Sequence, residues 1–151
     1  MRTIALLAPL ALGGCAALGI GGPPERWIDA RLPAAPREEL WTVVRASLHK
    51  AEFPRVEVNP VEGIATTGWF VSGHPFARQT FRERAHVRLE TEEEGVVPIS
   101  LRVERERNTT VRSPLDLEKA KWKRIEDSVE RAQFVLYQIG ALLKNPRLPG
   151  P

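Results

Sequence analysis

The sequence predicts an α+β domain: a helix, a four-stranded antiparallel sheet and a long C-terminal helix, with both helices on one sheet face. Segments 81–89 and 97–103 alternate apolar and polar residues on either side of a charged turn at 92–95. Such alternation is typical of an antiparallel hairpin with one buried face and one wet face. Apolar residues three and four positions apart in 36–51 and in 122–143 predict the helices. An apolar sheet face needs a cover, so both helices are expected on it.

The first helix and a first hairpin follow from local signals. Pro36 suits the first position of a helix over 36–51. Segments 56–58 and 64–71 are rich in β-branched and aromatic residues and flank a turn at 59–63, so they are predicted to pair as strands.

The last helix is expected to begin at Ser113-Pro114, an N-cap followed by a first-turn proline, and to end before Asn145-Pro146. Its sustained apolar spacing is also compatible with a coiled-coil seam. The favoured interpretation is a helix that lies along the sheet, because the alternating strands must bury their apolar side.

The N-terminus has the parts of an export signal. A basic start is followed by the apolar run 4–12 and by Leu12-Gly13-Gly14-Cys15, which contains the only cysteine. The run is too short for a membrane-spanning helix, which needs about 20 apolar residues. The alternatives are an ordinary signal peptide with an incidental cysteine and a frayed hydrophobic N-terminus.

The segment ending at Cys15 resembles the lipobox of bacterial lipoproteins. The resemblance implies that residues 1–14 are removed as a lipoprotein signal peptide. It implies that Cys15 carries acyl chains such as palmitate on its sulfur and its new amino group. Ala16, where an aspartate is absent, resembles the outer-membrane choice in that family, which would place the domain on the outer membrane, facing the periplasm.

The rest of the chain is expected to form one domain. Residues 15–35 are interpreted as the lipidated cysteine and a flexible tether, because glycine and proline dominate their first half. Trp27 and Ile28 in this tether are predicted either to enter the membrane interface or to pack on the domain. The folded domain covers 36–145, and 146–151 are expected to be a disordered tail.

Composition excludes several classes of function. The formal net charge of the whole chain is only +3, so nucleic-acid binding is not expected. A single cysteine excludes a disulfide within the chain, and His49, His74 and His86 lack metal-ligand spacing. Ser72-Gly73-His74 lacks the glycine-flanked elbow of a nucleophilic serine. No enzyme activity, cofactor or metal is predicted.

One face of the predicted sheet is the candidate interaction surface. Its wet side carries arginines, together with either Trp69 or Phe70, because strand neighbours alternate. The candidate residues, including one from the loop before the third strand, are Trp69, Phe70, Phe76, Arg82, Arg84, Arg88 and Arg102. Arginine and aromatic residues are enriched in interfaces, and arginine also recognises phosphates. The alternative is a merely solvated surface with cross-strand ion pairs, Arg84 opposite Glu104 and Glu83 opposite Arg105.

The order of elements over 36–145 is similar to the helix-grip domains of the lipoprotein component C of the outer-membrane β-barrel assembly machinery. The residues that carry this loose likeness are Trp41, Phe53, Val56, Val58, Gly63 and Trp69. The chain also resembles small uncharacterised bacterial lipoproteins through Asn108-Thr109, Pro114-Leu115-Asp116 and Trp122. Neither likeness implies a catalytic activity.

The function expected from these features is that of a non-catalytic, membrane-anchored lipoprotein of the cell envelope that docks an unknown envelope protein. The alternative is a lipid- or glycolipid-binding lipoprotein that grips an acyl chain between the long helix and the sheet.

Overall fold

The computed structural model describes residues 22–72, 80–110 and 116–144. Its elements, in chain order, are β1 (Ile28–Pro33), α1 (Arg37–Lys50), β2 (Glu57–Asn59), β3 (Ile64–Thr66), β4 (Phe70–Ser72), β5 (Phe81–Leu89), β6 (Val96–Asn108), β7 (Trp122–Ile125) and α2 (Val129–Lys144). The predicted α+β class is therefore confirmed. The described part holds two helices and one antiparallel sheet of seven strands, where four strands were predicted.

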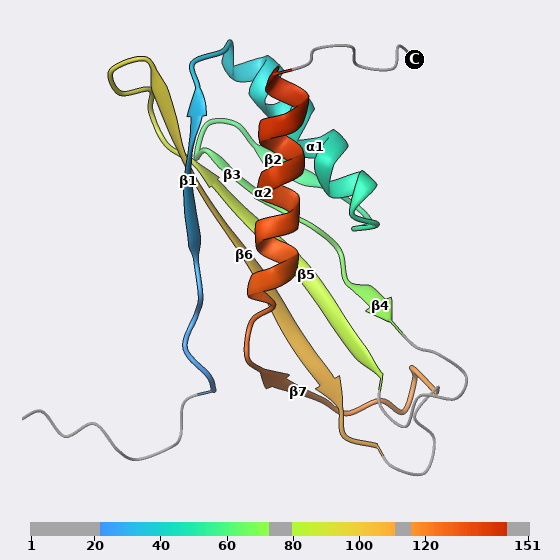
Figure 1. The fold of residues 1–151 in the computed structure, drawn as a ribbon. Coiled ribbons are helices and arrows are strands. Elements are labelled where there is room, and N and C mark those ends of the chain that lie inside the picture. The colour runs from blue at the N-terminus through green and yellow to red at the C-terminus, as the bar shows by residue number, and fades with distance from the viewer. Residues whose placement is uncertain (1–21, 73–79, 111–115, 145–151) are drawn as a thin grey trace, which may run out of the picture.

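The long strand β6 organises the sheet (Figure 1). It pairs along one side with β5, and the sheet continues through β3 to β2, while β4 also pairs with β5. On its other side β6 pairs first with β1 and then, near its end, with β7. The partners of β1 are Val96 to Leu101 and those of β7 are Arg105 to Asn108, so residues 102–104 lie between the two short strands.

The β5–β6 hairpin is confirmed, including its register. Arg84 lies opposite Glu104 and Glu83 lies opposite Arg105, as the alternation around the charged turn predicts. Period-two burial fixes this register, because a slip by one residue would turn every apolar side chain towards water.

The prediction of a flexible tether is wrong for residues 28–33, because they form β1 and pair with β6. Ile28, Ala30 and Leu32 turn towards the core while Asp29 and Arg31 stay exposed, a short alternation that the neighbouring prolines and glycines obscure. The edge of β6 supplies the hydrogen bonds that hold this segment.

The prediction of one long C-terminal helix is wrong for the first part of that segment. Residues 122–125 form β7, and α2 begins only at Val129. Trp122 and Ile125 fit the helical spacing of the residues after them, but the end of β6 offers unpaired backbone groups, and pairing there satisfies them. The predicted strand 64–71 is likewise divided into β3 and β4, because Gly68 between them donates its N–H to Pro54 O at 2.8 Å instead of to a strand.

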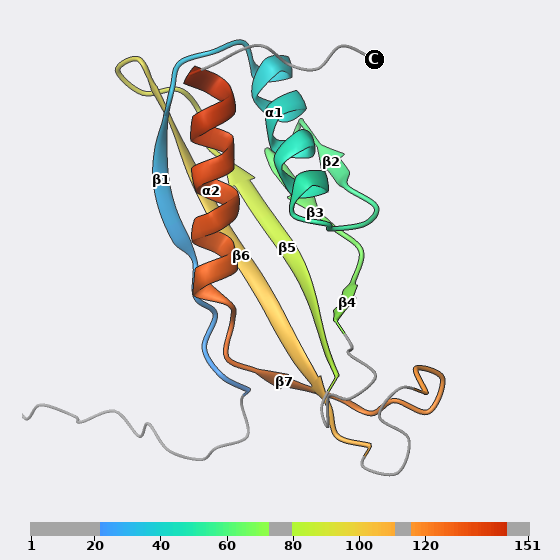
Figure 2. The ribbon, with the colours of Figure 1, turned by 45° about the vertical axis from the view of Figure 1, so that its right-hand side comes forward.

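The helices and the sheet enclose one core. Figures 1 and 2 show α1 and α2 side by side over the sheet, with α2 along β1 and β6. The prediction that the C-terminal helix packs on the sheet is therefore confirmed. The fully buried side chains include Leu40, Val44, Leu48, Phe53, Val87, Ile99, Leu101, Val103, Val135 and Ile139.

The turn before β3 depends on glycine at position 63. Gly63 has a φ of +69°, and a Cβ there would lie 2.5 Å from the backbone oxygen of Leu89. Gly95 has a φ of +80°, but nothing lies within 4 Å of the Cβ position. Both glycines occupy the left-handed region, but only Gly63 is also packed against a neighbouring strand.

Gly63→Ala is expected to destabilise the protein more than Gly95→Ala. The left-handed conformation costs an alanine about 1–2 kcal/mol at either position. At Gly63 the clash with the β5 backbone adds to that cost and disturbs the β3–β5 pairing. Urea unfolding of the two variants measures the difference; equal losses would contradict the close approach.

Candidate functional site

The wet face of the sheet, which faces away from the helices, is formed mainly by alternate residues of β5 and β6. Ala85, Val87 and Leu89 point into the core, so Arg84 and Arg88 point the other way. We refer to this side as the outer face.

The structure decides between the two aromatic candidates. Trp69 lies on the outer face, where the guanidinium groups of Arg82 and Arg84 stand 4.2 Å and 4.5 Å from its ring centre. Phe70 points to the helix side, where its ring centre lies 6.5 Å from that of the buried Phe53. Trp69 and Phe70 therefore point to opposite faces, as neighbouring residues of an extended segment are expected to do.

Two further tryptophans continue the row. Arg82 also covers Trp122 of β7 at 4.6 Å, and Arg88 covers Trp27 at 3.8 Å. We call the six residues Trp27, Trp69, Trp122, Arg82, Arg84 and Arg88 the tryptophan–arginine ladder. Cation–π contacts of this kind contribute about 0.5–1 kcal/mol each at exposed sites. The ladder therefore holds planar arginine side chains in fixed positions on the surface.

Carboxylates of β6 lie beside the ladder. An Nη of Arg82 is 2.6 Å from Glu106, and Nε of Arg84 donates to Glu104 at 2.7 Å. His86 shares Glu104 at 3.1 Å. The cross-strand ion pairs expected of a solvated surface are thus present. Each carboxylate contacts only part of the guanidinium group with which it pairs.

Arg102 is not an exposed member of the face. Its side chain is 6% exposed and its Nε donates to Asp127, itself 1% exposed, at 2.7 Å. Its Nη1 lies 2.5 Å from Glu25, and the backbone N–H of Arg26 donates to Asp127 at 2.8 Å. Arg102 sits between β1 and β7, where it ties the N-terminal segment and the start of α2 to β6.

This cluster shifts two pKa values. Burial by itself lowers the pKa of Arg102, but the hydrogen bond and charge of Asp127, with Glu25, outweigh burial and raise it. The pKa of Glu25 is lowered, first by the hydrogen bond from Trp27 and then by the charge of Arg102. Both groups therefore stay charged at neutral pH, and Arg102 serves as a structural cation.

His86 and Glu104 also have shifted pKa values. Burial lowers the pKa of His86, with help from Arg84 and Arg102, although the hydrogen bond to Glu104 opposes it. Burial raises the pKa of Glu104, but hydrogen bonds from Arg84 and His86 outweigh that, so its pKa is lowered. The ordinary pKa of a histidine, 6.5, applies to His86 in the unfolded chain, so the unfolded chain binds a proton at a higher pH than the folded protein does.

The free energy of unfolding is therefore expected to fall as pH drops from about 8 to about 5, and His86→Gln is expected to flatten that profile. In this window the folded state holds fewer protons at His86 than the unfolded state does, so acid favours unfolding. Urea unfolding at stepped pH measures it. The loss from Glu104, whose ordinary pKa is 4.5, comes at still lower pH and persists in the variant. An unchanged profile in His86→Gln would count against the role of this histidine.

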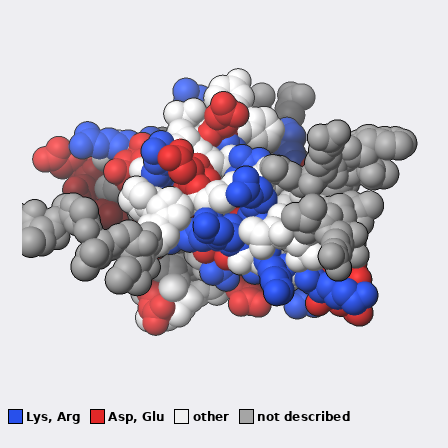
Figure 3. Space-filling view, turned by 90° about the horizontal axis from the view of Figure 1, so that it is seen from below, with Lys and Arg blue, Asp and Glu red and all other residues white. Residues whose placement is uncertain are grey.

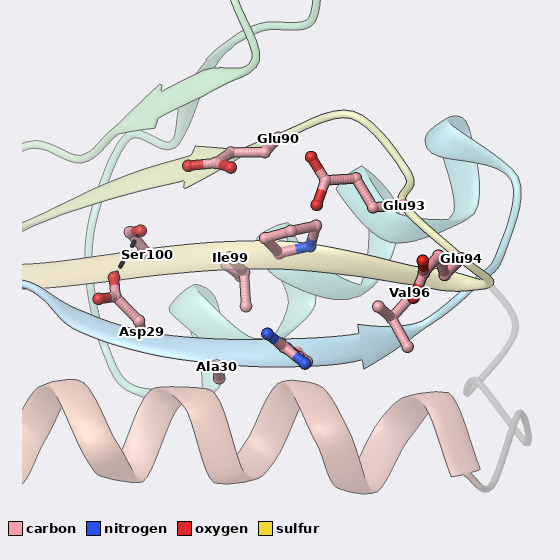
Figure 4. A pocket seen from close by; sticks show the side chains of 10 residues that line it. Asp29, Ala30, Glu90, Glu93, Glu94, Val96, Ile99 and Ser100 are labelled. Carbon is pink, nitrogen blue, oxygen red and sulfur yellow. Dashed lines mark hydrogen bonds between the residues drawn. The ribbon is translucent and has the colours of Figure 1, made fainter.

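Two open depressions of opposite charge lie along this side of the sheet. The first, of about 370 Å³, is lined by Arg84, Arg88, Arg102, Arg124 and His86, with Glu25 and Glu104 among them. The second, of about 830 Å³, lies by the 90–95 turn (Figure 4). Its lining contains Arg31 and four acidic residues, Asp29, Glu90, Glu93 and Glu94, and Asp29 accepts a hydrogen bond from Ser100. The charge of the surface thus changes sign along β6.

The helix side holds a separate cluster. Glu83 is buried between Arg105 at 3.3 Å and Arg131 at 3.2 Å, and Arg131 covers the rings of Phe53 and Phe70. Arg131 also donates to the carbonyl of Ala51 at 2.6 Å. These contacts join α1, α2 and β5, and they give Phe70 a packing role.

Several predicted features lie outside the described part of the chain: Cys15 with the signal peptide 1–14, Phe76, His74, the expected helix start at Ser113-Pro114 and the tail 146–151. Among residues 22–72, 80–110 and 116–144, no group of three potential metal ligands comes together. Within the same residues no helix has the length and apolar character needed to cross a membrane.

Sequence reasoning missed Trp27 and Trp122 on the outer face. The patterns place Trp27 in the tether and Trp122 in a helix, and they link neither to the arginines. No local pattern could have found Trp122, because its pairing beside Asn108 at the end of β6 depends on the folded sheet. The buried ion pair of Arg102 with Asp127 has no local signal, because 25 positions separate them.

Comparison with known proteins adds no relative: no family model matches the chain, and a search of the curated proteins finds no match.

Proposed function

We propose that this protein is a non-catalytic lipoprotein, anchored through Cys15 to the outer membrane and facing the periplasm, whose domain docks an envelope protein. The lipobox-like run before Cys15 supports the anchor. The order of elements is also similar to that of helix-grip domains, with seven strands in place of the four expected, but this likeness implies no activity.

The tryptophan–arginine ladder is the observation that carries the docking role. Tryptophan and arginine dominate the residues on which protein interfaces depend most. Stacking on Trp69 and pairing with Glu104 and Glu106 fix the guanidinium planes before a partner arrives. Binding then costs less side-chain entropy than it would for mobile arginines.

Arg88 is the ladder residue best suited to a test. It is exposed and stacks on Trp27, and the described residues give it no ion pair. Arg102 is unsuitable for this test. Strand alternation alone predicts that Arg102→Glu leaves the fold intact. Because Arg102 is buried and paired with Asp127, we expect Arg102→Glu to unfold the domain instead.

The experiment is photocrosslinking of the lipidated protein in its own membrane, with the photoreactive residue at Arg88 or, as control, at the exposed Tyr137 of α2. A specific crosslinked protein is expected from position 88 and not from 137, and Arg84→Glu is expected to reduce its yield several-fold. Equal products from both positions, or none from 88, would contradict docking through the ladder.

The described residues give the lipid-binding alternative no support. Val97, Ile99, Leu101 and Val103 of β6 are buried under α2, and Val135 and Ile139 fill the space above them. An acyl chain there would have to displace this packing.

A further inference from the structure

The described N-terminal segment lies against β7. The position of a Cβ on Gly22 would be 3.7 Å from the side chain of Arg124, and Arg26 is hydrogen-bonded to Asp127 just after β7. Figures 1 and 2 show the first described residues at this end of the sheet. The point where the chain leaves the domain towards Cys15 is therefore fixed.

The link from that point to Cys15 is short. Cys15 precedes Gly22 by seven positions, which span at most about 25 Å when fully extended. A lipid anchor on Cys15 would therefore keep the β7 end of the domain within reach of the bilayer surface. The remainder of the domain can lie down on the membrane or stand away from it.

Cations gather at the same end. Figure 3, which views the molecule from this side, shows lysine and arginine side chains across the middle of the surface. Arg107 of β6 lies directly opposite Lys123 of β7, and Lys121 immediately precedes β7. Among the described residues none of these three cations has an ion pair. Like charges directly opposite on neighbouring strands repel, so this arrangement favours an external anion.

The opposite end carries the other sign. The turn 90–95 contains Glu90, Glu92, Glu93 and Glu94, and β6, with its 13 residues, separates it from Lys123 by about 40 Å. Charges interact through salt water over only about 10 Å. A phosphate surface beside β7 therefore attracts the cations without repelling the glutamates, provided that the domain stands upright.

We propose that the β7 end, through Lys121, Lys123 and Arg107, docks on the phosphate groups of the bilayer surface and holds the domain upright, with the acidic turn directed away. This inference rests on the lipid anchor of the proposed function. The upright position leaves the tryptophan–arginine ladder beside the membrane and open to a partner.

The test uses the lipidated protein in vesicles that contain spin-labelled lipids. A fluorescent label is placed at Leu117→Cys, near β7, or at Glu92→Cys, in the acidic turn; a lipidated Cys15 leaves the new thiol as the only one that reacts. With phosphatidylglycerol in the vesicles, we expect the label at 117 to be quenched at least about threefold more than the label at 92, because each basic residue near an anionic surface adds attraction. With phosphatidylcholine alone, or at high salt, the difference is expected to shrink.

The decisive variant is Lys121→Glu with Lys123→Glu, which is expected to abolish the difference. Glutamate at 123 faces Arg107, so the strand pairing is preserved. Arg45→Glu with Lys50→Glu changes the net charge equally on the exposed side of α1 and is expected to keep the quenching at 117. A protein that stays on the vesicles but quenches equally with and without phosphatidylglycerol, or equally in the two double variants, overturns the docking and leaves the anchor intact. A crosslink from 117 to a protein in native membranes, without lipid quenching, also overturns it. A protein that does not float with vesicles overturns the anchor and the docking together.

Discussion

Asp127→Asn is expected to lower the free energy of unfolding by about 3–5 kcal/mol, because it leaves a buried cation without its main partner. The side chain of Asp127 is 1% exposed and has three partners: Arg102 at 2.7 Å, Arg124 at 3.5 Å and the backbone N–H of Arg26 at 2.8 Å. Its neutralisation leaves the guanidinium of Arg102 buried, with the half-exposed Glu25 as its remaining ion-pair partner and the charge of Glu104 nearby.

Urea unfolding measures this loss, and the neighbouring Glu126→Gln is the control. The Glu126 side chain is 73% exposed and lies 3.6 Å from Arg26, so its loss is expected to cost no more than about 0.5 kcal/mol. Replacing both members of the buried pair, Arg102→Met with Asp127→Leu, is expected to cost less than Asp127→Asn alone, because the buried cation is removed together with its main partner. Glu25 and Arg124 also lose a partner, but their side chains are 52% and 28% exposed. A loss below about 1 kcal/mol in Asp127→Asn would show that water reaches the site.

Ile139→Ala is expected to cost about 2–5 kcal/mol, because it removes a fully buried side chain of α2 from its packing on the sheet. Ile139 belongs to the same core cluster as Leu32 of β1 and Leu101 of β6. The cavity left by its truncation cannot be filled without moving the helix on the sheet.

Tyr137→Ala, two positions earlier on α2, is the matched control. Its side chain is 74% exposed, so its truncation is expected to change the free energy of unfolding by no more than about 0.5 kcal/mol. Thermal or urea unfolding of both variants decides the matter. Similar losses at 137 and 139 would contradict the orientation of α2 on the sheet.

Local patterns predicted the central hairpin and the β2–β3 pair at one edge of the sheet, but not the other edge, which β1 and β7 form. The β5–β6 hairpin follows from alternation over 81–89 and 97–103, and even its register was predictable because one face must be buried. β1 and β7 are short segments that form strands because they pair with the open edge of β6. No local pattern in their own residues indicates that pairing. Propensity over four to six residues is too weak to predict such pairing.

The candidate surface was predictable only in part. Alternation put Arg82, Arg84 and Arg88 on the outer face, where the structure has them. It also put Arg102 there, but the segments that precede β1 and follow β7 close over this residue and bury it. Strand alternation tells which face a side chain points to, and it says nothing of what covers that face.

The α+β class, the first helix, the register of the central hairpin and the arginine-rich side of β5 could all be predicted from the amino-acid order. These features depend on spacing within one or two neighbouring segments. The folded domain was needed to find that Trp27, Trp69 and Trp122 stack on the arginines of one face, that Arg102 is a buried structural cation, and that the chain leaves the domain beside β7. Each of these depends on contacts between segments far apart in the chain, whose free energy exists only once the sheet has formed.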